Sequence, residues 1–310
     1  MSFRFIPIPI AALAFAGSLF AAPAEKPEVN ITVEGETRVI QSNGLPDHRP
    51  GRFPNAHNPN EIAPQDHKFR VTTKPVAAEQ PTPAKHAIFG VGLNGVPFDP
   101  GTAEFWDGDP AWNYEAGTGF MDLGLDSSHA HVQPNGAYHY HAMPNGLIEK
   151  QGGDDGKKMV LVGWAADGFP IYSAFGLTDP QNAASPLKKL KSSYRLKKEK
   201  REGGPGGKPD GTFTADFGFV PEAGDLDECN GRFSVTPEFP EGTYAYHLTE
   251  EFPFVPRLWR GTPDPSFEKR GGPGGGPGGP GRPGGGPGGP GRPPRGGRPP
   301  GPGFPPPPPR

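Results

Sequence analysis

Cysteine is nearly missing from this 310-residue chain, which contains only Cys229. A single cysteine has no partner for an intrachain disulfide, so a disulfide-stapled fold is excluded. Long hydrophobic runs are also missing after the N-terminus, and no later segment is apolar enough to cross a membrane. Core packing or a bound ion must therefore hold the folded part together.

Familiar catalytic motifs are missing as well. The chain has no G-x-S-x-G, H-E-x-x-H or P-loop motif. The acidic turn at residues 225–228 lacks the glycine and the twelfth-position glutamate of an EF-hand, although calcium there stays an alternative. Asp227 and Glu228 flank Cys229 and disfavour its thiolate, which argues against a nucleophilic cysteine. The sequence thus leaves open whether the protein is an enzyme.

Glycine and proline are abundant instead, with 48 and 45 residues. Residues 271–310 hold 18 of the glycines and 16 of the prolines, together with five arginines and one phenylalanine. This segment cannot bury a core, so a disordered C-terminal tail is predicted, and its irregular glycine spacing excludes collagen. The remaining glycines and prolines disfavour long helices and favour a turn-rich β domain.

Charge divides the chain in the same way. The whole chain carries −3, and because the tail has five arginines, the rest carries −8. An acidic body argues against specific nucleic-acid binding. The basic tail has an anionic polymer or a cell-surface component as its candidate partner. Residues 187–201 contain six lysines and two arginines, which we interpret as a solvated loop rather than a nucleic-acid site, since no aromatic ladder is interleaved.

The N-terminus predicts the compartment. Arg4 precedes an apolar run over residues 5–20, and residues 22–24 read Ala-Pro-Ala, the pattern accepted by signal peptidases. Residues 1–24 are therefore predicted to be a signal peptide, which places the mature protein in the periplasm, outside the cell or on its surface. An uncleaved membrane anchor is the alternative, although the run is short for a span and contains two prolines.

Rigid corners divide the body into short strands. An Asn/Asp-Gly-apolar-Pro turn occurs at residues 43–46, 94–97 and 167–170, where glycine permits positive φ and proline fixes the next bend. Residues 158–175 read as two buried strands around the third corner. We predict one mostly β domain over residues 25–270, sandwich- or barrel-like, with few short helices.

A weak internal duplication is the most informative feature. Residues 125–141 and residues 226–247 both begin with Leu-Asp and end in a Pro-x-Gly turn followed by a Tyr-rich strand that closes on histidine. Ser128 in the first segment stands where Cys229 stands in the second. The repeat predicts two related Tyr/His hairpins packed as a pair.

Histidines concentrate in these hairpins. Because side chains alternate along a strand, His139 and His141 face one side and can share a ligand, which is typical of transition-metal sites. His131 and His129 lie just upstream, and His247 occupies the position of His141 in the second segment. The alternative is structural, with these imidazoles bonded to loop carbonyls.

Carboxylates accompany the histidines. Asp126 opens the first segment and Asp227 lies in the opening of the second, so each is a candidate ligand or a partner for an imidazole N–H. Imidazole suits zinc or copper, whereas calcium prefers oxygen ligands and is less favoured.

The run Tyr-His-Tyr-His at residues 138–141, within HVQPNGAYHYHAMP, resembles the signature of the YHYH-domain proteins, a family of mostly uncharacterised, usually secreted proteins. Further similar blocks are NGLPDH, RFPNAHNPN, VGLNGVPFDPGTAEFW, GWAADGFPIYS, SSYRLKK, DGTF, GDLDECNGRFSVTPEFPEGTYAYHLT and FPFVPRLWRG. The resemblance covers about residues 29–261 and implies a shared fold and candidate site, without an assigned reaction. This chain departs from it at Ser128, His129 and Ala130, where members often have Cys and Gly.

The leading hypothesis is a secreted protein that binds a transition metal through its histidine cluster. The alternative is a non-catalytic surface or matrix protein that binds a glycan, a protein or an anionic polymer.

Overall fold

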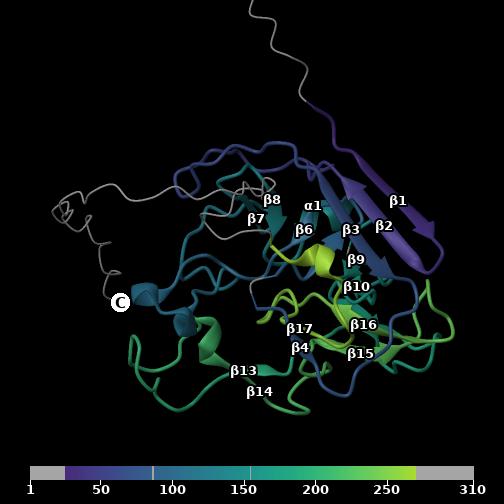
Figure 1. The fold of residues 1–310 in the computed structure, drawn as a ribbon. Helices are drawn as coiled ribbons and strands as arrows, with labels where there is room; N and C mark the ends of the chain where they lie inside the picture. The colour runs from purple at the N-terminus through teal and green to yellow at the C-terminus, as the bar shows by residue number, and fades with distance from the viewer. Residues whose placement is uncertain (1–24, 86, 154, 270–310) are drawn as a thin grey trace, which may run out of the picture. The chain divides into compact units, whose positions relative to one another are not determined.

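The computed structural model describes residues 25–85, 87–153 and 155–269. These residues form a mostly β structure of short strands and long connections (Figure 1). The predicted fold class is confirmed: several sheets are present and helices are few and short.

An eight-stranded sheet organises the structure. Its strands in chain order are β5 (Gly90–Gly92), β6 (Pro97–Phe98), β7 (Ala130–Val132), β8 (Tyr138–Tyr140), β9 (Leu161–Ala165), β10 (Pro170–Tyr172), β15 (Gly231–Ser234) and β16 (Thr243–His247). Their spatial order is β15-β16-β10-β9-β5-β6-β8-β7. With β15 and β7 as its edges, this sheet is open and does not close into a barrel.

The sheet consists of two equivalent halves. In each half a tight hairpin, β5–β6 or β9–β10, pairs in parallel with a second hairpin, β7–β8 or β15–β16. The halves meet where β5 and β9 pair antiparallel, with Val91 opposite Trp164. The corners at residues 94–97 and 167–170 close the two tight hairpins, as equivalent bonds show: Gly95 and Gly168 donate to the carbonyls of Gly92 and Ala165. The duplication therefore covers the whole sheet.

The two Tyr/His hairpins have the same register. In β7–β8, His131 lies opposite His139, and in β15–β16, Arg232 lies opposite Ala245. Their turns contain glycines at φ 87° and 90°, Gly136 and Gly242, a region that side chains disfavour. The expectation that the hairpins pack as a pair was wrong. They stand at opposite ends of the sheet with four strands between them, because each pairs with its own tight hairpin.

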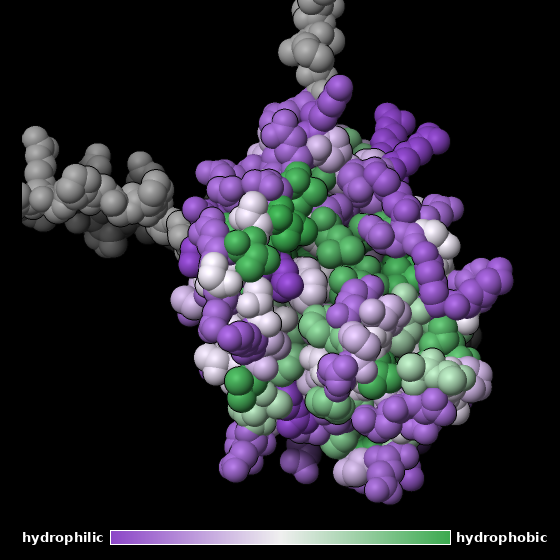
Figure 2. All heavy atoms as spheres, turned by 90° about the vertical axis from the view of Figure 1, so that its right-hand side faces the viewer, coloured by the Kyte–Doolittle hydropathy of each residue, from purple (hydrophilic) through white to green (hydrophobic). Residues whose placement is uncertain are grey.

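A second sheet contains β1 (Val29–Glu34), β2 (Thr37–Ser42) and β3 (His67–Thr72), paired antiparallel in that order. Phe69 and Val71 of β3 are buried, whereas all six residues of β1 are exposed. Figure 2 shows the side of the molecule on which β1 lies in Figure 1, where apolar residues gather within polar surroundings. Val29, Ile31 and Val33 are among the exposed apolar side chains.

The remaining elements are short. The two-stranded sheets pair β4 (Thr82–Pro83) with β17 (Leu258–Trp259), β11 (Phe175–Leu177) with β12 (Leu187–Lys189), and β13 (Tyr194–Leu196) with β14 (Phe217–Phe219). The helices are α1 (Asn145–Lys150) and the 3-10 turns η1 (Trp106–Gly108), η2 (Pro110–Trp112), η3 (Thr214–Asp216) and η4 (Pro265–Phe267). Prolines and glycines throughout the connections explain why helices do not extend.

The main core receives the tyrosines of both hairpins. Tyr138, Tyr140 and Tyr246 are fully buried in one cluster, where Tyr246 meets Phe89 edge to face at 5.0 Å between ring centroids. Phe89 also stacks on Trp259 at 5.9 Å. Because strand side chains alternate, burial of the tyrosines on one side directs the neighbouring histidines to the other.

The predicted signal peptide and the predicted tail at residues 271–310 lie outside the described residues, as do His86, Asp154 and Arg270. None of the helices among the described residues is both long enough and apolar enough to span a bilayer.

Candidate metal centre

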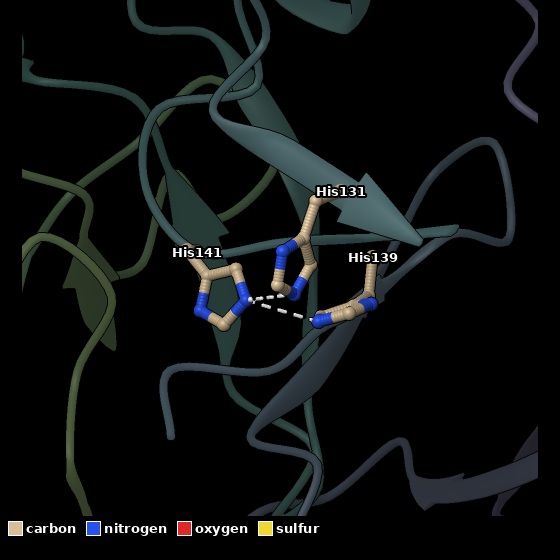
Figure 3. Close-up of side chains that lie close together, drawn as sticks. All are labelled: His131, His139 and His141. Carbon is tan, nitrogen blue, oxygen red and sulfur yellow. Dashed lines mark hydrogen bonds between the residues drawn. The ribbon is translucent and has the colours of Figure 1, made fainter. Parts of the chain in front are cut away.

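Three histidines converge beside the first Tyr/His hairpin. The Nε2 atom of His141 lies 3.0 Å from Nε2 of His139 and 3.1 Å from Nε2 of His131. Figure 3 shows the three rings pointing toward one another, with His131 from β7 and the other two from β8 and its end. Among the described residues, these three histidines form the one group of at least three histidine, cysteine or carboxylate side chains that lie close enough together to hold an ion.

Backbone carbonyls orient two of the three rings. Nδ1 of His131 lies 3.0 Å from the carbonyl oxygen of Leu123, and Nδ1 of His139 lies 3.2 Å from that of Ala137. Because a carbonyl only accepts, each Nδ1 carries the proton, and each Nε2 presents a lone pair toward the shared point. Nδ1 of His141 is buried and has no hydrogen-bond partner among the described residues.

Burial keeps the imidazoles neutral. It lowers the pKa of His139 and His141 well below the usual value, and the neighbouring histidines lower it further. Burial also lowers the pKa of His131, whose side chain remains partly exposed. Neutral imidazole is the form that binds a metal, so these rings need no deprotonation at neutral pH.

The spacing of the nitrogens fits a metal. Zinc binds histidine nitrogen at about 2.0–2.1 Å, so two nitrogens of a tetrahedral site lie roughly 3.3 Å apart. The observed 3.0 and 3.1 Å are slightly shorter. A small outward shift of the rings would therefore suffice to admit an ion.

A buried carboxylate, paired with a more exposed lysine, lies close to the cluster. Asp99 follows β6, and its backbone N–H donates to the carbonyl of Tyr140, which places it beside His141. Its carboxylate accepts from Lys269, at 2.6 Å between Nζ and the nearer oxygen, and from Gln133 at 3.1 Å. Asp99 was not among the predicted site residues, although it follows β6, the short strand that leads out of the corner at residues 94–97.

The tyrosines hold the opposite side of the hairpin. The hydroxyl of Tyr138 donates to Asp126 at 2.6 Å, and the hydroxyl of Tyr140 contacts Nε2 of His48 at 2.7 Å and the amide of Asn94 at 3.0 Å. Burial raises the pKa of both tyrosines, so their hydroxyls remain protonated. They fix the strand and leave the histidine side to the site.

Asp126 and His129 lie in the turn that leads into the hairpin. Asp126 accepts hydrogen bonds from the backbone N–H groups of Ser128 and Gly51, both at 2.8 Å, in addition to the Tyr138 hydroxyl. His129 has a φ of 52°, and its Nδ1 bonds to the carbonyl of Met143 at 2.8 Å. The structure places both outside the three-histidine group, in roles that shape the turn.

The second hairpin carries the other two candidates. Asp227 accepts from the N–H of Cys229 at 2.9 Å, from the Tyr244 hydroxyl and from Arg260, and thus matches Asp126 in its turn. His247 is buried with Nδ1 3.1 Å from the carbonyl of Ser173. Arg232 and Ala245 stand in that hairpin where His131 and His139 stand in the first, so His247 has no imidazole partners from its own hairpin.

Cys229 is buried in the main core. Burial, together with the charge of Asp227, raises the pKa of its thiol to about 12. A protonated, enclosed thiol is a poor nucleophile, as the neighbouring carboxylates predicted.

Comparison with known families gives one match. A family model described as YHYH protein matches residues 68–261, more than half of the chain. The matched range contains the whole eight-stranded sheet and all three clustered histidines. Comparisons with curated proteins and with solved structures gave no match.

Proposed function

The chain belongs to the YHYH protein family, and we propose that it binds one transition-metal ion, zinc or copper, through Nε2 of His131, His139 and His141. The observation that carries the proposal is the convergence of these nitrogens: Nε2 of His139 and Nε2 of His131 both lie within 3.1 Å of Nε2 of His141. Imidazole is a ligand that both metals favour.

The proton count favours an ion over a hydrogen-bonded cluster. His131 and His139 both direct Nε2 lone pairs toward Nε2 of His141, because their protons are held at Nδ1 by carbonyls. His141 has at most one proton at Nε2, so it can satisfy only one of them when neutral. A buried acceptor left unsatisfied costs about 1–3 kcal/mol. A metal ion would satisfy all three lone pairs at once.

Three protein ligands leave room for a fourth that is not protein. Structural zinc sites usually have four protein ligands, whereas catalytic sites have three and bind water or substrate at the remaining position. His139 and His141 are buried and His131 is partly exposed, so a ligand would approach from the His131 side. Bound zinc would supply an activated water there, and copper would supply redox chemistry.

Secretion is part of the same proposal. It rests on the apolar run and the Ala-Pro-Ala sequence that precede residue 25. The resemblance to a mostly secreted family supports it.

Metal analysis of the full chain, purified without a polyhistidine tag, tests the proposal. We expect close to one equivalent of zinc or copper after loading and removal of excess ion. The His139→Ala/His141→Ala variant should lose it, and the matched His247→Ala variant, which removes a buried histidine outside the cluster, should retain it. Substoichiometric metal in the unmutated protein, or full retention by the double variant, would contradict the proposal.

A further inference from the structure

The basic segment at residues 187–201 forms one wall of a cleft. The cleft, of about 670 Å³, lies between β13, β14 and the turn at residues 251–252. Its lining combines cations and aromatic rings: Lys191, Tyr194, Arg195, Lys198, Phe217 and Phe252. The fold thus adds Phe217 and Phe252 to the basic run, whose own aromatic residue is Tyr194.

The cations of the cleft have no carboxylate partners within the described chain. Arg195 donates to the backbone carbonyls of Ser192, Tyr194 and Ala223, so its position is fixed while its charge stays uncompensated. Lys191 and Lys198 are exposed, and neither forms an ion pair with a described residue. Glu251 is the carboxylate in the lining, which leaves an excess of positive charge.

Neighbouring lysines in the same segment differ in this respect. Lys188 pairs with Asp225 at 2.5 Å, and Lys189 pairs with Glu250 at 2.6 Å. Lys188 and Lys189 are therefore compensated, whereas Lys191 and Lys198 at the cleft are not compensated by any described residue, on a body whose overall charge is negative.

The floor of the cleft is apolar. Phe217 and Phe252 stack face to face at 4.0 Å, and Tyr194 meets Phe252 edge-on at 5.3 Å between centroids. Leu196, at the rim, is 43% exposed. Stacking covers one face of each phenylalanine ring, so the floor presents apolar aromatic and aliphatic surface without a row of open platforms for bases.

We propose that this cleft binds an acidic polysaccharide, with uronate carboxylates on Lys191, Arg195 and Lys198 and the C–H faces of the sugars over Leu196 and the aromatic floor. Carboxylates complement uncompensated cations, and the C–H faces of sugars pack against apolar and aromatic surface. The site is separate from the metal centre and does not depend on it.

A charge-matched pair of variants tests the cleft in the full chain. Binding of a fluorescent oligogalacturonate should weaken about tenfold in Lys191→Gln/Lys198→Gln, because two exposed charge contacts are lost. Lys197→Gln/Lys200→Gln removes the same charge from two other exposed, unpaired lysines of the described segment, which do not line the cleft, and should change affinity less than about twofold. The arginine-rich tail is common to all variants, so it cannot produce the difference.

Four results would overturn the proposal. Equal weakening in both double variants would show a general charge effect, and unchanged binding in both would place the contact elsewhere. Single-stranded DNA that binds as tightly as oligogalacturonate, with the same dependence on Lys191 and Lys198, would show a nucleic-acid site. Leu196→Ser adds an apolar test, since it should weaken oligogalacturonate binding while leaving the unfolding midpoint unchanged; unaltered affinity would also overturn the assignment.

Discussion

His141 and His247 occupy equivalent positions in the two related hairpins, yet only His141 meets other imidazoles. The backbone N–H of each donates to the carbonyl of the matching turn residue, His129 at 2.8 Å and Asn230 at 3.0 Å. Beside His141 stand His131 and His139, whereas the second hairpin has Arg232 and Ala245 at these positions. The duplicated sheet therefore presents a three-histidine cluster in only one of its halves.

In the second half, apolar packing takes the place of the histidine cluster. Ala245 lies in an apolar cluster with Tyr172 and Leu177, where an imidazole stands in the first half. Burial, and after it the nearby charge of Arg232, lowers the pKa of His247 to about 3. A fixed cation near a single neutral imidazole disfavours binding of a second cation there.

Metal should stabilise the folded protein through the three-histidine cluster. At a free ion concentration about 100 times the Kd, linkage predicts a gain of about 2.7 kcal/mol. Thermal unfolding of the full chain with and without zinc should show this as a rise in Tm. His139→Ala/His141→Ala should abolish the rise, and His247→Ala should keep it. Equal metal-induced shifts in all three proteins would move the binding site away from the cluster.

Acid should destabilise the metal-free protein partly through His247. Its folded-state pKa of about 3 lies below the value of about 6.5 expected in the unfolded chain. Between these pH values the unfolded chain takes up a proton that the folded protein does not, so stability is present above about pH 6.5 and is lost as pH falls. One such group contributes a slope of about 1.4 kcal/mol per pH unit.

Urea unfolding in chelator between pH 6.5 and 4 measures this slope. His247→Gln should make the dependence shallower by about one proton, whatever its effect on absolute stability. An identical slope in the His247→Gln variant and the unmutated protein would show that His247 is not buried as the structure has it.

Much of the site follows from local rules in the sequence. The period of two along a strand places His139 and His141 on one side, and the tyrosines on the other, without knowledge of the fold. The short spacing between His131 and this strand permits a hairpin, and its register sets His131 opposite His139. Each of these steps involves residues within ten positions of one another.

The rest depends on long-range pairing. Sequence similarity between the hairpins shows that they are related but not that they touch, and the sheet order separates them. Asp99 reaches the site only because β6 pairs in parallel with β8, 42 positions along the chain, as the Phe98–Tyr140 register shows. The corners at residues 94–97 and 167–170 were visible in the sequence, but their equivalence within the two halves required the sheet.

Asp126 should prove to be a structural residue. Its oxygens hold the Tyr138 hydroxyl and the Gly51 and Ser128 N–H groups, so Asp126→Ala leaves partly buried donors unpaired. The free energy of unfolding should fall by about 3 kcal/mol, and by less in Asp126→Asn, which keeps one acceptor oxygen. Asp66→Ala, at an exposed carboxylate, should have little effect.

The Asp126→Asn variant also tests whether Asp126 is a metal ligand or a structural residue. In copper-loaded protein, Asp126→Asn should leave the electron paramagnetic resonance spectrum unchanged, because Asp126 lies outside the three-histidine group. His131→Ala should change or abolish that spectrum. A changed spectrum in Asp126→Asn would make this carboxylate a ligand.

Cys229 should be inert in the folded protein and reactive once it unfolds. The thiol is fully buried and its pKa is raised to about 12, so at pH 8 its thiolate fraction is roughly a thousandfold below that of an unfolded cysteine of pKa about 8.5. Iodoacetamide labelling followed by mass spectrometry should therefore be negligible in buffer and complete in urea. Ser128 fills the equivalent turn position in the first hairpin, so Cys229→Ser should fold, with a loss below about 2 kcal/mol. Rapid labelling without denaturant would mean that this turn opens in the folded protein. Hydrogen exchange at the N–H of Cys229, which donates to Asp227, would then measure how often it opens.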